Sequence, residues 1–167
     1  SVKVDGNKQE WANTDHALFV GEKSQVQGTL RCSCDDKNVY FLVEVLDRSL
    51  LRGDYATVYL SPDDSKSLAN GAKRIQVSMD GLKSTETYAG KWNSAEMGVE
   101  VKTYVCNDTN EDRIDNYGYI AEISIPRSSL TISSGQVLVN FSITDNKEEE
   151  AVSDVSSISR WIPVAGL

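Results

Sequence analysis

Two consecutive segments between Asn38 and Asp64 alternate apolar and polar residues, and no other feature of the sequence constrains the fold as strongly. The apolar residues that share one side of each segment are Val39, Phe41, Val43 and Val45 in the first, and Ala56, Val58 and Leu60 in the second. A period of two predicts β-strands, because successive side chains of a strand point to opposite faces. Two strands cannot bury these faces alone, so a second sheet has to cover them.

The rest of the chain repeats this period in several segments that are separated by turn residues. The pattern predicts about nine or ten strands, no long helix and no internal repeat, which is typical of an antiparallel β-sandwich of jelly-roll type. The 167 residues suit a single domain, residues 1–167. We expect the wide ring of Trp11 to close one end of the sandwich.

The charge balance narrows the classes of partner. The chain has 17 Lys and Arg against 25 Asp and Glu, a net charge of -8. Such a chain is repelled by nucleic-acid phosphates and by anionic lipid surfaces, so we expect neither nucleic acid nor a membrane as a partner. A neutral, hydroxyl-rich ligand is tolerated, and Ca²⁺ is favoured because hard cations prefer carboxylate oxygens.

Two carboxylates bracket the loop between the central strands. Asp47 ends the first strand and Asp54 precedes the second. Either these side chains accept hydrogen bonds from backbone amides of the loop, or they bind a structural Ca²⁺. We take them as the candidate metal ligands.

The cysteines and the single histidine argue against catalysis or a zinc site. Cys32 and Cys34 share a strand face with Val26 and Leu30, so either they are buried thiols or one of them forms a disulfide with Cys106. His16 is the only histidine, too few for a usual zinc site, and no Ser or Cys has a recognisable catalytic partner. We therefore predict a non-catalytic protein.

One predicted outer face is rich in hydrogen-bonding and aromatic side chains. The strand after the central pair alternates Arg74 and Gln76 with apolar residues, and the strand before it presents Tyr55 and Tyr59 on the same side. Trp92 follows in a glycine-containing loop, where it either covers the sandwich edge or offers a flat surface to a ligand ring. We expect the four side chains of the strands to face water and to form a binding platform, which Trp92 would extend in the second case.

Several local patterns occur in an order that resembles carbohydrate-binding module family 9, a relative of DOMON-type domains. The segments VDGNKQEW, VYFLVEVLD, GDYATVYLSPDD, GYIAEISIP and VLVNFSITDN carry this resemblance over nearly the whole chain. It implies a calcium-stabilised β-sandwich that binds an oligosaccharide or polysaccharide. It also implies neighbouring domains in a larger secreted, bacterial, glycoside-active protein.

The resemblance also implies roles for individual residues. In the family, a tryptophan and an acidic residue before the second central strand form part of the sugar slot. Leu51 and Arg52 occupy these positions here, which argues against the family's ordinary specificity for glucose ends. Arg74 matches the family's sugar-binding arginine, Gln76 replaces its amide partner, and Trp161 is the candidate for the second tryptophan.

Two other functions compete with sugar binding. The domain could be a structural spacer that packs against neighbouring domains. Related sandwiches bind haem between Met and His or Lys ligands, but Met79 is predicted to point inward and His16 lies on a distant loop, so we expect no haem.

Overall fold

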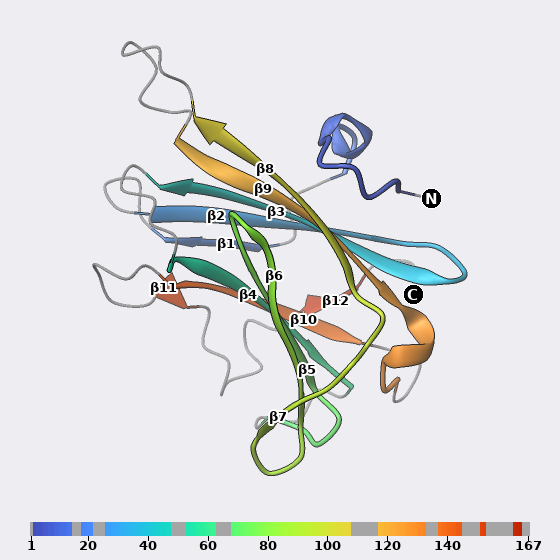
Figure 1. The fold of residues 1–167 in the computed structure, drawn as a ribbon. Helices are drawn as coiled ribbons and strands as arrows, with labels where there is room; N and C mark the ends of the chain where they lie inside the picture. The colour runs from blue at the N-terminus through green and yellow to red at the C-terminus, as the bar shows by residue number, and fades with distance from the viewer. Residues whose placement is uncertain are drawn as a thin grey trace.

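The structure is a computed structural model, and it describes residues 2–14, 18–21, 26–47, 53–62, 68–107, 117–132, 137–144, 151–152 and 162–164. These residues form two antiparallel β-sheets that pack face to face (Figure 1). Nine of the strands contain four or more residues and three are shorter. The predicted antiparallel β-sandwich is confirmed.

The first sheet has five strands and contains the first central strand. In their order across the sheet the strands are β1 (Leu18–Gly21), β2 (Val26–Cys34), β3 (Asn38–Asp47), β9 (Tyr117–Pro126) and β8 (Glu100–Asn107). Residues 2–14, the N-terminal segment, lie across the outer side of this sheet and include the short helix η1 (Gln9–Trp11) (Figure 1).

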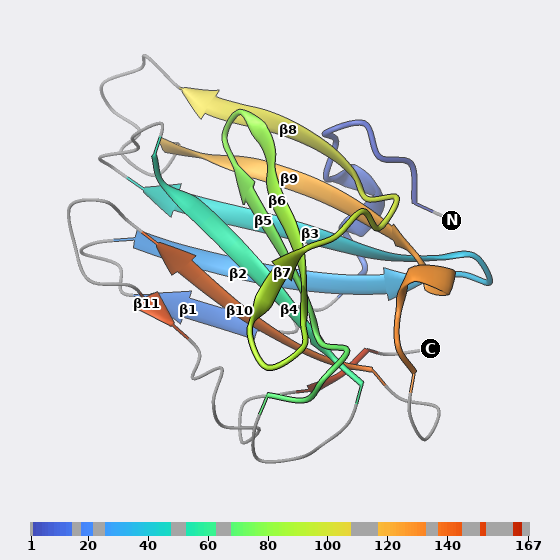
Figure 2. The ribbon, with the colours of Figure 1, turned by 60° about the horizontal axis from the view of Figure 1, so that its bottom comes forward.

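The second sheet has seven strands and contains the second central strand. Its order is β11 (Ala151–Val152), β10 (Leu138–Thr144), β4 (Tyr55–Ser61), β5 (Lys73–Ser78), β6 (Gly81–Tyr88) and β7 (Trp92–Ser94), with β12 (Ile162–Pro163) also paired to β10. Figure 2 shows this sheet in front of the other one. The short helix η3 (Arg127–Ser129) follows β9, and the described residues contain no helix that could cross a membrane.

The core lies between the two sheets and consists of the alternating residues that the sequence predicts. Val39, Phe41, Val43 and Val45 are buried in it, as is the apolar row of β4. The two sheets approach closely at Gly28 of β2. A Cβ atom at this position would lie 2.2 Å from the Cδ1 atom of Ile143 in the opposite sheet, so only glycine fits without repacking.

Two expectations about individual residues were wrong. Trp11 is buried on the outer side of the five-stranded sheet, against Tyr40, Leu42 and Ile120, and does not close an end of the sandwich. Trp92 was expected in a loop, although it begins β7.

The cysteines and Met79 behave as core residues. Cys32 and Cys34 pack against the core from the inner face of β2, and burial raises the pKa of Cys32 to about 12. The side chain of Cys106 lies outside the described part of the structure. Met79 also packs against the core, as its strand parity predicts.

Candidate functional site

The outer face of the seven-stranded sheet brings together side chains from five neighbouring strands. Because the strands are antiparallel and in register, residues of equal parity form straight rows across the sheet. One row contains Asn140 of β10, Tyr59 of β4, Arg74 of β5, Glu86 of β6 and Ser94 of β7. The middle of this face is therefore polar and aromatic.

Arg74 is held in place by an ion pair and an aromatic ring. Its Nε and Nη2 atoms donate to Oε1 of Glu86 at 3.0 and 2.7 Å. Its guanidinium carbon lies 4.5 Å from the ring centroid of Trp92, a cation–π distance. The Arg74 and Glu86 side chains remain 22% and 19% exposed, so a ligand can reach both.

Trp92 forms the centre of an aromatic group. The ring centroid of Tyr88 lies 5.3 Å from it in an edge-to-face arrangement, and that of Tyr59 lies 6.2 Å away with a tilt of 51°. Trp92 is half-buried, whereas Tyr59 is buried. We call Tyr59, Arg74, Glu86, Tyr88 and Trp92 the Arg74 cluster.

Gln76 lies in the adjacent row, and its amide is used inside the protein. Nε2 of Gln76 donates to Oγ1 of Thr57 at 3.3 Å, while its Oε1 accepts from Oγ of Ser84 at 2.9 Å. Lys83 donates to the same Oε1 at 3.4 Å and lies 4.4 Å from the ring centroid of Tyr55. Gln76 and Tyr59 are both buried, so the expectation that they face water was wrong, although both lie on the outer side of the sheet.

The structure thus brings Arg74, Trp92 and Tyr59 into contact and places Gln76 and Tyr55 beside them. Trp161, Leu51, Arg52 and His16 lie outside the described residues. Glu86 and Tyr88 were not predicted, because they belong to β6 and the sequence does not show this strand clearly. The dipeptide Asp80-Gly81 between two strands is a hairpin signal that could have revealed this strand.

The candidate metal ligands Asp47 and Asp54 are both buried, with 3% of their surface exposed. Tyr119 pairs across the sheet with Val45, two residues before Asp47. Burial, and then the charges of Asp54 and Asp47, raise the pKa of its hydroxyl above the usual value. This hydroxyl is buried and has no hydrogen-bond partner among the described residues. The three side chains supply buried oxygen atoms at one end of the sandwich, which is the chemistry that Ca²⁺ requires.

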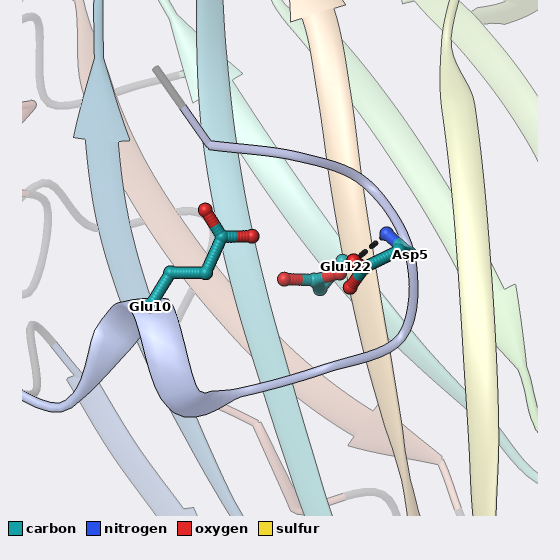
Figure 3. Close-up of side chains that lie close together, drawn as sticks. All are labelled: Asp5, Glu10 and Glu122. Atoms are coloured by element: carbon teal, nitrogen blue, oxygen red, sulfur yellow. Dashed lines mark hydrogen bonds between the residues drawn. The ribbon is translucent and has the colours of Figure 1, made fainter.

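A second acidic group lies on the outer side of the five-stranded sheet. Asp5, Glu10 and Glu122 each place a carboxylate oxygen within 4.8 Å of the others (Figure 3). Glu122 is completely buried, and it accepts bonds from the amides of Asp5 and Gly6 at 2.8 and 2.7 Å and from Nε1 of Trp11 at 2.9 Å. Since three donors satisfy this carboxylate, its role is to anchor the N-terminal segment.

The comparison with known families agrees with this arrangement. The family model described as "Carbohydrate family 9 binding domain-like" matches residues 4–164. The chain belongs to this family. It is therefore a non-catalytic carbohydrate-binding domain, and no catalytic residue is assigned to it.

The sequence identity between this family 9 domain and its individual relatives is low. Endo-1,4-beta-xylanase C from Paenibacillus barcinonensis is 28% identical over 121 residues, which cover 72% of this chain and 10% of the xylanase. The chain thus spans about a tenth of the length of that relative.

Two solved structures of a family 9 module from Caldicellulosiruptor kristjanssonii share the fold. The cellotriose complex superimposes with a TM-score of 0.65 at 17% identity, covering 96% of this chain and 84% of the module. The glucose complex gives 0.66 at 16% identity, with 98% and 90% coverage.

Proposed function

We propose that this family 9 domain binds a neutral saccharide on the outer face of its seven-stranded sheet, at the Arg74 cluster. The observation that carries the proposal is the stacking of Arg74 on Trp92 while Glu86 fixes the guanidinium from the side. A pyranose ring has an apolar face that packs on an aromatic ring and hydroxyls that require planar, oriented donors and acceptors. The cluster supplies both kinds of contact: the ring of Trp92 for stacking, and Arg74 and Glu86 for hydrogen bonds.

The hydrogen-bonding capacity of the ion pair supports this proposal. An arginine has five N–H donors, and only two of those of Arg74 are used on Glu86 among the described residues. Oε2 of Glu86 accepts no hydrogen bond within the same set. Because the pair is already ordered, a ligand would gain these contacts at a low entropic cost.

Other predicted residues take supporting roles in this proposal. Gln76 orients the polar row through Thr57 and Ser84, and Tyr55 extends the surface at one side. We assign Trp161 as the second ring of the site. This is supported by the pairing of its chain neighbour Ile162 with β10 at Val139, one residue from the row that contains Arg74.

The relatives support a saccharide as the class of ligand. The solved modules hold cellotriose or glucose, and the homologous enzyme is a xylanase. We infer that this chain is an accessory domain of a secreted bacterial protein that acts on plant polysaccharides, with neighbouring domains as its other partners. A net charge of -8 supports neutral polymers over nucleic acid or anionic membranes.

Calorimetric titration with cellotriose and xylotriose, together with a glycan array, tests the proposal. Trp92→Ala and Arg74→Ala should each weaken binding roughly tenfold or more, equivalent to about 1.4 kcal/mol. Lys73→Ala, which removes a neighbouring positive charge of the opposite strand parity, is the matched control and should leave affinity unchanged. If the native chain bound none of the glycans, the result would instead favour a structural spacer domain.

We also propose that Asp47 and Asp54 bind a structural Ca²⁺, with the hydroxyl of Tyr119 beside it. The support is the burial of both carboxylates next to a buried hydroxyl that lacks a hydrogen-bond partner in the described structure. When bound, the ion would supply positive charge that offsets the two buried carboxylates.

Thermal unfolding with Ca²⁺ and with a chelator tests the ion site. The midpoint should fall on chelation in the native chain, since an ion that binds only the folded state stabilises it. Asp54→Asn should remove this dependence, whereas Asp5→Asn should keep it. An identical midpoint with and without chelator would argue that the two carboxylates serve the loop alone.

A further inference from the structure

The outer face of the five-stranded sheet contains a pocket that the proposed function does not use. Its volume is about 570 Å³, within the roughly 300–1,000 Å³ typical of small-ligand sites. It lies between residues 5–9 of the N-terminal segment and strands β3, β9 and β8. The Arg74 cluster lies on the other side of the sandwich, so the two regions cannot contact one ligand ring (Figures 1 and 2).

The floor and one wall of the pocket are apolar. Ile120 of β9 and Tyr104 of β8 lie side by side and form this part, and Glu44 of β3 follows on the other side of Ile120. In the next row Leu46 pairs with Gly118. Because glycine has no side chain, no side chain from β9 fills the space beside Leu46 there. Tyr104 is 60% exposed and Leu46 is 46% exposed, although both are large apolar residues on a folded surface. An exposed aromatic ring beside an aliphatic floor provides a stacking surface for a flat or pyranose ring.

The opposite wall of the pocket has unused hydrogen-bonding capacity. Glu44 is held by two cations: its Oε2 accepts from Nζ of Lys8 at 3.2 Å, and its buried Oε1 lies 3.6 Å from Nη2 of Arg31. Asn7 accepts from the amide of Gln9 through Oδ1, which leaves its Nδ2 donor available within the described contacts. This amide can donate to a sugar hydroxyl, and Oε2 of Glu44 has a second lone pair that can accept from one.

The charges of the pocket favour a neutral occupant. Asp5 and Glu44 line it together with Lys8, so an anionic ligand would meet a net negative wall. Lys8 is itself paired with Glu44, which reduces the attraction for a cation. A ring with hydroxyl groups satisfies both the stacking wall and the polar wall without a charge of its own.

We propose that this cavity, the Tyr104 pocket, is a second saccharide site that takes one or two neutral pyranose units. The inference rests on the proposed function, because it assumes that the domain acts on polysaccharides. Sites on opposite faces would hold two neighbouring polymer chains rather than one. Binding to a solid polymer would then exceed the affinity of either site through effective concentration.

Titrations of the full chain with cellotriose and xylotriose, followed by backbone amide NMR, test the second site. We expect two separate sets of shifted amides, one around Arg74 and one around Glu44, Tyr104 and Ile120. Tyr104→Ala should remove the second set alone, and retention on insoluble cellulose or xylan should fall roughly tenfold. Phe19→Ala, which removes another exposed aromatic ring at 55% exposure outside the pocket, should change neither.

The outcomes separate this inference from the proposed function. Shifts confined to the Arg74 cluster, unchanged by Tyr104→Ala, would overturn the second site and leave the first. Shifts confined to the Tyr104 pocket, unchanged by Trp92→Ala, would support the second site and refute the proposed one. Because Tyr104 is exposed, its variant should unfold at the native midpoint, which checks that any loss is local.

Discussion

The two outer faces of the sandwich use the same residue types for different purposes. On the five-stranded sheet, the indole of Trp11 donates to the buried carboxylate of Glu122, and the N-terminal segment covers both. On the seven-stranded sheet, Trp92 lies beside the Arg74 and Glu86 pair, and all three side chains stay partly exposed. A tryptophan next to a carboxylate is therefore structural where every hydrogen bond is satisfied and accessible to a ligand where some are not.

The sharpest way to test this contrast is to truncate the two glutamates. Glu122→Ala removes a buried acceptor from three donors, which should lower the free energy of unfolding by roughly 3 kcal/mol or more. Glu86→Ala breaks a partly exposed ion pair and should cost about 1 kcal/mol or less. Urea unfolding of both variants measures the difference.

The interpretation of Glu122 as an anchor would be refuted if the two variants were equally stable. Glu122→Gln is a useful third variant, because its amide keeps an acceptor oxygen while the charge is lost. We expect its stability to lie between those of the native chain and Glu122→Ala.

The two tryptophans permit a smaller test of the same contrast. Trp11→Phe keeps a ring but loses the indole donor to Glu122, so the free energy of unfolding should fall by about 1–2 kcal/mol. Trp92→Phe should change stability by less than about 0.5 kcal/mol, since no hydrogen bond of this indole is found among the described contacts. Paired denaturation curves check this. A larger loss for Trp92→Phe would mean that the Arg74 cluster is mainly structural.

The smallest expected effect is on the loss of folding stability at acid pH, and it concerns Asp35. Hydrogen bonds from the hydroxyl of Tyr40, and then from the amides of Asn38 and Lys37, lower the pKa of Asp35 to about 2. A pKa below the unfolded value of 3.8 stabilises the folded state above about pH 4, and this contribution is lost as the pH falls towards 2.

Asp35→Asn should therefore reduce the dependence of stability on pH between about pH 4 and pH 2. Thermal midpoints of the native chain and the variant, measured across this interval, provide the comparison. A variant with the native acid profile would show that Asp35 does not contribute to it. Asp36→Asn, at the neighbouring position of the same turn, serves as the control.

The sequence predicted those features that depend on strand parity. Parity placed Arg74 and Gln76 on the outer side of β5, and Tyr59 on the same outer side of β4. It failed for β6, because the inner positions opposite Ile75 and Lys73 are Thr85 and Thr87, whose hydroxyl side chains leave no hydrophobic period. Glu86 and Tyr88 were missed for that reason.

The covering of the five-stranded sheet could not be predicted for a different reason. The bond between the amide of Asp5 and Glu122 joins residues that are 117 positions apart, and no local pattern encodes such a contact. A buried glutamate at the centre of an apolar strand was the available signal, since such a residue requires partners from elsewhere in the chain. The burial of Gln76 has the same origin, because its partners come from the strands on either side.

The pairing of Arg74 with Glu86 has a consequence for how the domain would perform in different media. Because the guanidinium charge is compensated within the protein, a sugar would meet a locally neutral surface, and capture would not depend on long-range attraction. The ionic strength of the solution would then have little effect on the affinity of the domain for a polymer. Proteins that bind phosphate groups differ, because their affinity falls steeply with salt. Sugar recognition at such a neutral surface would be equally effective in brackish water, in soil fluid and in dilute buffer.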